Sequence, residues 1–306
     1  MHYERILAAV AATPWAIEPN KGRELGAILS RRIRDGESPA ADIEAARAIA
    51  AAREERKAKP RPSGVAVIPL HGVMIQRADW FMETSGILST EQVGQLVDQA
   101  ADDPSVEAII LDVDSPGGSV FGTEELAGKL ADATKQKKVI AVANAVAASG
   151  AYYVASQASE LVVSPSGQVG SIGVFMMHVD RSEELRQAGL TVTFVASSQR
   201  KVAGNQYSPL DPVGRDEMEQ QVSGYYDLFV KAVARGRSTT QTNVREKFGG
   251  GGMVLAEQAV KLGMADRVAT LDDVLGRYGL RAADLTPAAQ VDRSDIEIRK
   301  RRLALD

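Results

Sequence analysis

Short apolar runs alternate with segments of helical periodicity from about residue 64 onward. Runs that are nearly all apolar are typical of strands covered on both faces of a parallel sheet. They predict strands over 64–70, 106–113, 138–144, 161–164, 172–176 and 191–195. Apolar residues at helical spacing predict helices over 123–134, 149–158, 182–188, 213–236, 244–248 and 256–262. This alternation indicates an α/β domain with a mostly parallel sheet and a helical C-terminal part.

The two ends of the chain differ from this central pattern. Residues 1–62 combine an Ala-rich stretch over 40–52 with a charged, Pro-containing end, and we expect a helical arm and a linker rather than core. Residues 281–306 are expected to form a charged tail with a helix over 293–302. The folded domain is therefore predicted to span 63–280.

Composition removes several classes of protein. A net charge of −4 argues against nucleic-acid binding as the main role. The absence of cysteine excludes a disulfide framework, a Cys nucleophile and Cys-containing zinc sites, and we expect neither metal nor cofactor. The apolar run Ile6–Ala12 is too short to cross a bilayer, so we expect no membrane anchor and a cytoplasmic location.

Three Gly/Ser-rich turns follow predicted strands, where ligands of parallel sheets tend to bind. In Asp114–Ser119, the adjacent Gly117 and Gly118 leave backbone amides open for an anion or oxyanion, although a plain turn is the alternative. In Ala145–Tyr153, Ser149 sits between small residues and suits a nucleophile, although a helix N-cap is the better explanation of this turn taken alone. Ser171, in Gly167–Val174, is available for a side-chain hydrogen bond or belongs to a structural turn.

A serine nucleophile needs a base, and the chain offers few. Of three histidines, His2 lies at the chain start, and neither His71 nor His178 belongs to a segment with a matching Asp-bearing turn. Lys201 lies in a loop after the strand predicted at 191–195. A lysine can act as base when burial lowers its pKa, and Ser–Lys dyads are an alternative to the Ser-His-Asp triad.

Four motifs together resemble the S49 peptidase family, which includes signal peptide peptidase A enzymes and phage head-maturation proteases. In chain order they are Asp112–Gly118, Ala147–Tyr153, Gly170–Val174 and Lys201, and the resemblance covers about residues 64–270. It implies a ClpP/crotonase-like fold of repeated ββα units and a Ser–Lys dyad. The sequence at 194–212 is similar to the phage-type branch.

The resemblance also assigns roles to individual residues. It implies that Ser149 is the nucleophile, that Lys201 is the general base, and that Ser171 helps to hold the lysine. The oxyanion hole would comprise Gly117, Gly118 and Gly150. In short members of the family, the serine and the lysine can come from neighbouring subunits of a ring-like or dome-like homo-oligomer.

The expected partners are polypeptide substrates, among them capsid or scaffold proteins, in a bacterial cytoplasm or a phage prohead. Two other functions stay open at this point. A crotonase-like acyl-CoA enzyme would share the fold and its glycine amides. A non-catalytic scaffold protein would act through the charged ends.

Overall fold

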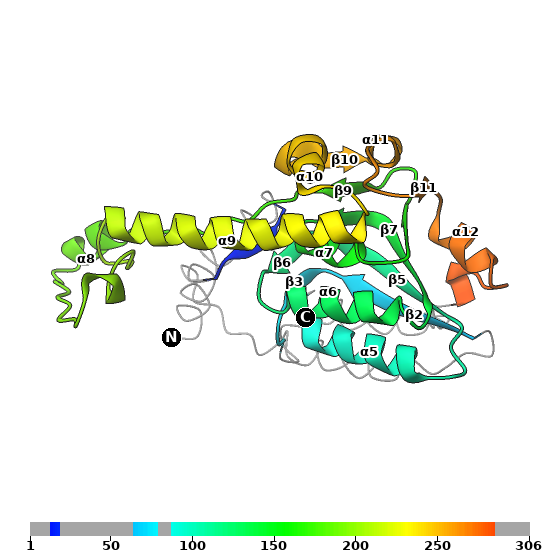
Figure 1. The fold of residues 1–306 in the computed structure, drawn as a ribbon. Coiled ribbons are helices and arrows are strands. Elements are labelled where there is room, and N and C mark those ends of the chain that lie inside the picture. The colour runs from blue at the N-terminus through cyan, green and yellow to red at the C-terminus, as the bar shows by residue number, and fades with distance from the viewer. Residues whose placement is uncertain (1–12, 19–63, 79–86, 285–306) are drawn as a thin grey trace, which may run out of the picture.

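The computed structural model describes residues 13–18, 64–78 and 87–284 of the chain. Helices cover a central sheet, and one long helix projects far beyond it (Figure 1). Of the expectations above, the Ala-rich stretch over 40–52 and the tail helix over 293–302 lie outside the described residues. In the described part, no helix combines the length and apolarity needed to span a membrane.

The central sheet has seven strands and is mostly parallel. Neighbouring strands run in the order β10-β9-β7-β5-β2, with β8 paired to β7 and β11 to β8, and only the β9–β10 pair is antiparallel. The bounds are β2 Val65–His71, β5 Ala108–Ser115, β7 Lys138–Ala148, β8 Glu160–Val163, β9 Gln168–Gly170, β10 Met253–Leu255 and β11 Arg267–Val268. The predicted α/β class with a mostly parallel sheet is confirmed.

A second sheet lies at the carboxyl ends of β2 and β5. Its four strands are β1 (Trp15–Ile17), β6 (Gly117–Ser119), β3 (Val73–Ile75) and β4 (Ile87–Ser89), hydrogen-bonded in that order. Each strand of the central pair β2 and β5 thus leads into this small sheet before a helix follows. That repetition is the expected ββα unit.

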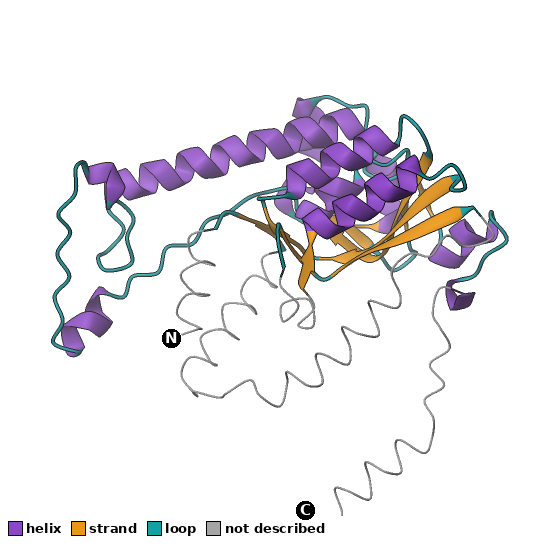
Figure 2. Cartoon of the chain, turned by 90° about the horizontal axis from the view of Figure 1, so that it is seen from below, coloured by secondary structure: helices purple, strands orange, loops and turns teal. Residues whose placement is uncertain are grey.

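Two helices cover one face of the central sheet, as Figure 2 shows in purple against the orange strands. They are α5 (Thr90–Asp102) and α6 (Thr123–Ala133), and Leu126 and Leu130 of α6 belong to the same core cluster as Leu111 of β5. Ile110 and Ile140 point to the other face, where α12 (Leu271–Gly276) packs. The sequence pattern did not predict α5 or α12.

The projection in Figure 1 is an arm formed by residues 174–211 and the first half of α9 (Pro212–Gly236). It contains α8 (Ser182–Gln187) and the 3₁₀ turn η1 (Gln199–Lys201). The strands predicted at 172–176 and 191–195 are wrong: only Phe175 makes a bridge, and 191–195 is exposed coil. A strand needs a neighbour for its backbone groups, and the arm supplies none there.

The remaining C-terminal elements cover the end of the sheet near β9 and β10. They are α10 (Gln241–Lys247), η2 (Gly249–Gly251) and α11 (Ala256–Leu262). The last element, η3 (Ala282–Asp284), packs with α12 instead. Together with α9 they confirm the predicted helical C-terminal part.

Candidate active site

Ser149 occupies the sharp turn between β7 and the short helix α7 (Gly150–Ala155). Its backbone has φ 52° and ψ −120°, a conformation that only glycine adopts without cost. Its amide donates to Gly170 O at 2.7 Å, and its carbonyl accepts from the amide of Tyr153 at 2.9 Å. Strain held by flanking hydrogen bonds is characteristic of a strand-to-helix turn that presents a nucleophile. An ordinary N-cap residue has extended backbone, so the simple N-cap interpretation does not describe Ser149.

Gly117, Gly118 and Gly150 leave a small space beside this turn. A Cβ on Gly117, where φ is 90°, would lie 2.8 Å from the Gly150 nitrogen, and one on Gly150 would lie 3.6 Å from the Gly118 nitrogen. A Cβ on Gly118 would lie 1.9 Å from the carbonyl oxygen of Met74. No side chain therefore fits between the backbone of Gly117–Gly118 and that of Gly150, and an oxyanion hole requires backbone amides that are open in this way.

Ser115 supports this turn, and the sequence analysis did not single it out. Its hydroxyl donates to Gly72 O at 2.6 Å and accepts from the Gly117 amide at 3.1 Å. The hydroxyl thus ties the end of β5 to the turn after β2. The signal that could have found it is its position two residues before Gly117, since a serine hydroxyl in a Gly/Pro turn often bonds to the backbone two residues on.

Ser171 lies next to Ser149 in space. The pairing of β7 with β9 places Ala148 opposite Gly170, so the two serines follow paired residues. Ser171 is buried, has φ 54°, and its amide donates to Gly252 O at 2.8 Å. Its predicted role of holding a lysine stays a prediction.

Lys201 lies on the arm, away from Ser149 in the same chain. Its neighbour Arg200 pairs with Glu217 near the start of α9, whereas Tyr153 of α7 meets α9 at Leu228. Glu217 and Leu228 are separated by roughly 16 Å of helix at about 1.5 Å per residue. One chain therefore does not bring the predicted nucleophile and base together.

Neither candidate histidine replaces the lysine. His178 is on the arm, where its Nε2 lies 3.0 Å from Asn205 O. His71 forms a pair with Asp112 at 3.0 Å, which sequence spacing did not reveal. Asp112 of β5 pairs with Val142 of β7, and both lie on the face of the sheet opposite to α5 and α6. The His71–Asp112 pair therefore does not face Ser149. Among the described side chains, no three potential ligands gather as a metal ion would need.

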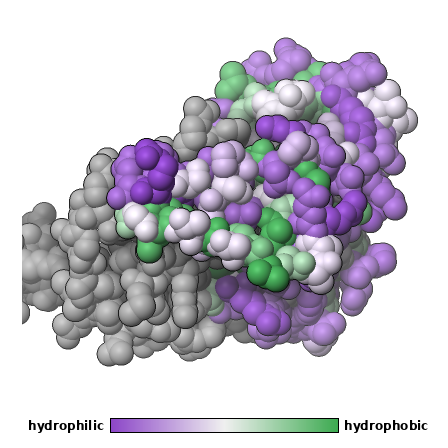
Figure 3. All heavy atoms as spheres, turned by 90° about the vertical axis from the view of Figure 1, so that its left-hand side faces the viewer, coloured by the Kyte–Doolittle hydropathy of each residue, from purple (hydrophilic) through white to green (hydrophobic). Residues whose placement is uncertain are grey.

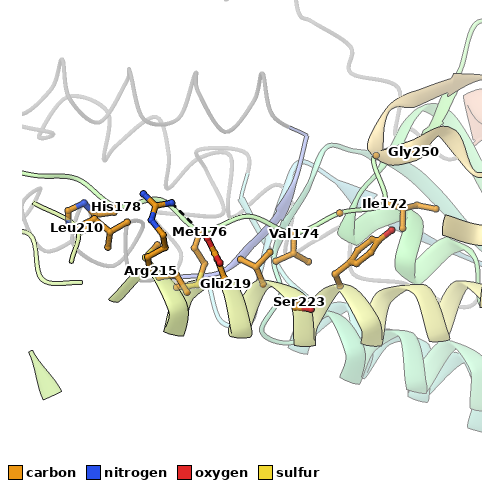
Figure 4. A pocket seen from close by; sticks show the side chains of 14 residues that line it. Ile172, Val174, Met176, His178, Leu210, Arg215, Glu219, Ser223 and Gly250 are labelled. Carbon is orange, nitrogen blue, oxygen red and sulfur yellow. Dashed lines mark ion pairs between the residues drawn. The ribbon is translucent and has the colours of Figure 1, made fainter. Parts of the chain in front are cut away.

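A groove of about 570 Å³ begins beside Ser149 and runs along α9. Gly173 lines it, and its carbonyl oxygen lies 3.4 Å from Ser149 Oγ. Figure 4 shows side chains from the extended segment and from α9 facing each other across the groove, with Arg215 and Glu219 paired at its outer part. Its apolar walls comprise Ile172, Val174, Met176, Met218, Val222 and Tyr226. The groove offers an apolar surface next to the nucleophile candidate.

The family model of peptidase family S49 matches residues 131–283, half of the chain, which include Ser149 and Lys201. The chain belongs to this family. The matched range excludes Gly117 and Gly118.

Two curated relatives come from phages. The head-tail preconnector protein GP5 of Enterobacteria phage P21 is 29% identical over 88% of this chain and 56% of its own length. The capsid assembly protease C of Escherichia phage lambda is 30% identical over 70% of this chain and 48% of its own. This S49 chain thus spans about half the length of the curated relatives it matches. A solved membrane-bound stomatin-specific protease is 18% identical over 69% of this chain and 78% of that chain, with a TM-score of 0.40.

Proposed function

We propose that this S49 chain is a serine endopeptidase in which Ser149 attacks the peptide bond and Lys201 of a neighbouring copy acts as the base. The observation that carries the proposal is the backbone of Ser149, with φ 52° and ψ −120°, placed beside the amides of Gly118 and Gly150. A structural turn has no need of a strained serine at that point. Strain of this kind clusters at catalytic residues because the surrounding fold must hold it.

The arm supports a base donated from a second copy. Seven of the ten exposed large apolar side chains in the described residues lie on it, which is unusual for a surface facing only water. They are Met177, Val179, Leu190, Val192, Phe194, Val195 and Tyr207. Figure 3 views the molecule from the side on which the arm projects, and green apolar side chains are spread over that face. A second copy packed against the arm would cover these side chains. Lys201 of the first copy would then lie next to Ser149 of the second copy.

The chemistry then follows from the positions of the groups. The unprotonated amine of the neighbour's Lys201 would take the Ser149 proton as Oγ attacks the substrate carbonyl. The amides of Gly118 and Gly150 would bind the oxyanion. The protonated amine would next protonate the leaving nitrogen, and water would release the acyl group from Ser149.

The likeness to the phage proteins favours capsid or scaffold polypeptides as substrates. The phage lambda relative bears the name of a capsid assembly protease. On this basis we propose that the chain acts in a bacterial cytoplasm or a phage prohead. The apolar groove beside Ser149 suits an extended polypeptide better than a small polar metabolite.

The decisive experiment mixes two inactive variants. Ser149→Ala and Lys201→Ala should each lose cleavage of denatured casein, and a mixture of the two should regain it, because some interfaces then pair an intact serine with an intact lysine. Lys261→Ala, a change on the surface helix α11, is the matched control and should cleave normally. Normal cleavage by Lys201→Ala would remove the lysine from the base role. A mixture that stays inactive would refute the sharing of the dyad between copies.

A further inference from the structure

Residues 13–18 lie inside the candidate active site, although the sequence analysis placed them in a helical arm outside the core. Trp15–Ile17 form strand β1, and all three residues are buried. Figure 1 shows this strand in blue, crossing close to β6 and beneath α9. The description of residues 1–62 as a helical arm is therefore wrong for this segment.

The segment is held on both edges, as an extended peptide in a protease cleft is held. On one edge, the Glu18 amide donates to Pro116 O at 2.8 Å and the Val120 amide donates to Pro14 O at 3.2 Å. On the other edge, Trp15 and Phe175 exchange two backbone hydrogen bonds of 2.9 and 3.0 Å. The six-residue segment thus lies in a slot between β6 and Phe175, which is at the start of the arm.

The register places one peptide bond of this segment at the predicted oxyanion hole. Ala16 pairs with Gly118. Its carbonyl oxygen lies 2.2 Å from the point that a Gly117 Cβ would occupy and 3.2 Å from the point that a Gly150 Cβ would occupy. The point for the Gly117 Cβ lies 2.8 Å from the Gly150 nitrogen, and the point for the Gly150 Cβ lies 3.6 Å from the Gly118 nitrogen. The Ala16 carbonyl oxygen therefore lies in the space between Gly117 and Gly150, next to the strand position of Gly118.

Ser149 has no exposed surface in this arrangement. The segment 13–18 occupies the edge of β6 beside the turn that carries Ser149, so a foreign polypeptide cannot pair with that edge while the segment stays in place. The carbonyl that does reach the oxyanion hole belongs to the chain itself.

We infer that the Ala16–Ile17 peptide bond is a self-cleavage site, and that cutting it opens the cleft to other polypeptides. The inference rests on the proposed function, since it uses the same serine and the same base. Ser149 Oγ forms an ester with the Ala16 carbonyl carbon as its proton passes to the amine base. The bond to the Ile17 nitrogen breaks, and that nitrogen takes the proton. One water then hydrolyses the ester, leaving a carboxylate on Ala16 and restoring the Ser149 hydroxyl.

The test follows the purified full chain over time by intact-mass measurement and by sequencing of the new N-terminus. The expected result is a peptide ending at Ala16 and a long fragment beginning at Ile17, whose masses sum to that of the parent plus one water. Ser149→Ala, shown to be folded by circular dichroism, should stay intact. Ala16→Phe should slow the cut at least tenfold, because the larger side chain must enter a space that holds a buried alanine. Ala283→Phe makes the same change at an exposed residue of η3 and should leave the rate unaltered.

A parallel assay with denatured casein separates the two proposals. If casein is cleaved while the Ala16–Ile17 bond survives, the self-cleavage inference is overturned and the endopeptidase proposal stands. If neither is cut by the assembled protein, the endopeptidase proposal itself fails. A cut at Ala16–Ile17 that persists in Ser149→Ala would also overturn the inference, because another protease would then be responsible.

Discussion

The backbone strain at Ser149 can be measured by comparing two substitutions at that residue. Ser149→Ala and Ser149→Gly both remove the hydroxyl, so both should lose activity. Alanine keeps the cost of φ 52° and ψ −120°, whereas glycine adopts this conformation freely. The difference in their free energies of unfolding therefore reports the backbone and not the lost hydroxyl.

The expected size of that difference follows from two opposing contributions. A non-glycine residue in a sparsely populated conformation costs about 1–3 kcal/mol. Glycine loses about 0.5–1 kcal/mol through the greater freedom of the unfolded chain. Ser149→Gly should thus be more stable than Ser149→Ala by about 1 kcal/mol, and by at most about 2.5 kcal/mol. For a chain of this size, each kcal/mol raises Tm by about 2–4 °C.

Urea unfolding followed by circular dichroism measures the difference, and Ser156 provides the matched control. Ser156 is also buried and ends the same helix α7, but its φ is −63° and its ψ −15°. At Ser156 the order should reverse, with the glycine variant less stable than the alanine variant by about 0.5–1 kcal/mol. If the control behaves in this way and Ser149→Gly is no more stable than Ser149→Ala, the turn stores no strain and the argument for a positioned nucleophile fails.

Three further predictions concern other parts of the molecule. A Cβ at Gly150 would lie 3.2 Å from the Ala16 carbonyl oxygen. Gly150→Ala keeps the amide but displaces a carbonyl bound there, so kcat/KM for a peptide substrate should fall by up to about 10². Gly128→Ala, with no atom within 4 Å, should leave kcat/KM unchanged. Burial raises the pKa of Glu160, but hydrogen bonds from Arg267 and Arg277 outweigh it and hold the pKa below its usual value of 4.5. Glu160→Gln should therefore lower the free energy of unfolding by about 1–2 kcal/mol at neutral pH. Thermal melts should show this cost disappearing as the pH falls through the lowered pKa, and a cost that stays constant down to pH 2 would contradict the ion pair. Val195 is 99% exposed. Val195→Asp should shift the protein toward smaller species in sedimentation velocity without lowering Tm. An unchanged distribution of sedimentation coefficients would exclude Val195 from the contact between copies.

The local pattern of the chain was sufficient to predict six of the eight α-helices and four of the eleven strands in the described residues. Helix α11 was predicted at its observed bounds, and α9 and α6 to within one residue. Local reasoning also made Ser149 a candidate, since a serine between small residues at a strand-to-helix junction is a local feature, but its role as nucleophile was predicted from the family resemblance. Strands buried on both faces and long helices leave their signature in neighbouring residues, because their periodicity reflects a continuous environment.

Contacts between distant segments could not be predicted in this way. The parallel register of β2 and β5 brings His71 to Asp112, although 41 residues separate them. The stretch 191–195 is as apolar as a strand but stays coil, since the arm offers its backbone no partner. Whether an apolar run becomes a strand depends on what lies beside it.

The amino-acid order by itself determined the α/β domain, the glycine-lined turns and the serine between them, because each depends on residues close together along the chain. Only the tertiary structure decided that Trp15–Ile17 enter the cleft and that Lys201 projects away from Ser149 on the arm. Both outcomes depend on which surfaces meet across large separations in sequence. Such long-range contacts depend on complementary shape and on backbone groups that need hydrogen-bond partners. Neither can be predicted from a short stretch of neighbouring residues.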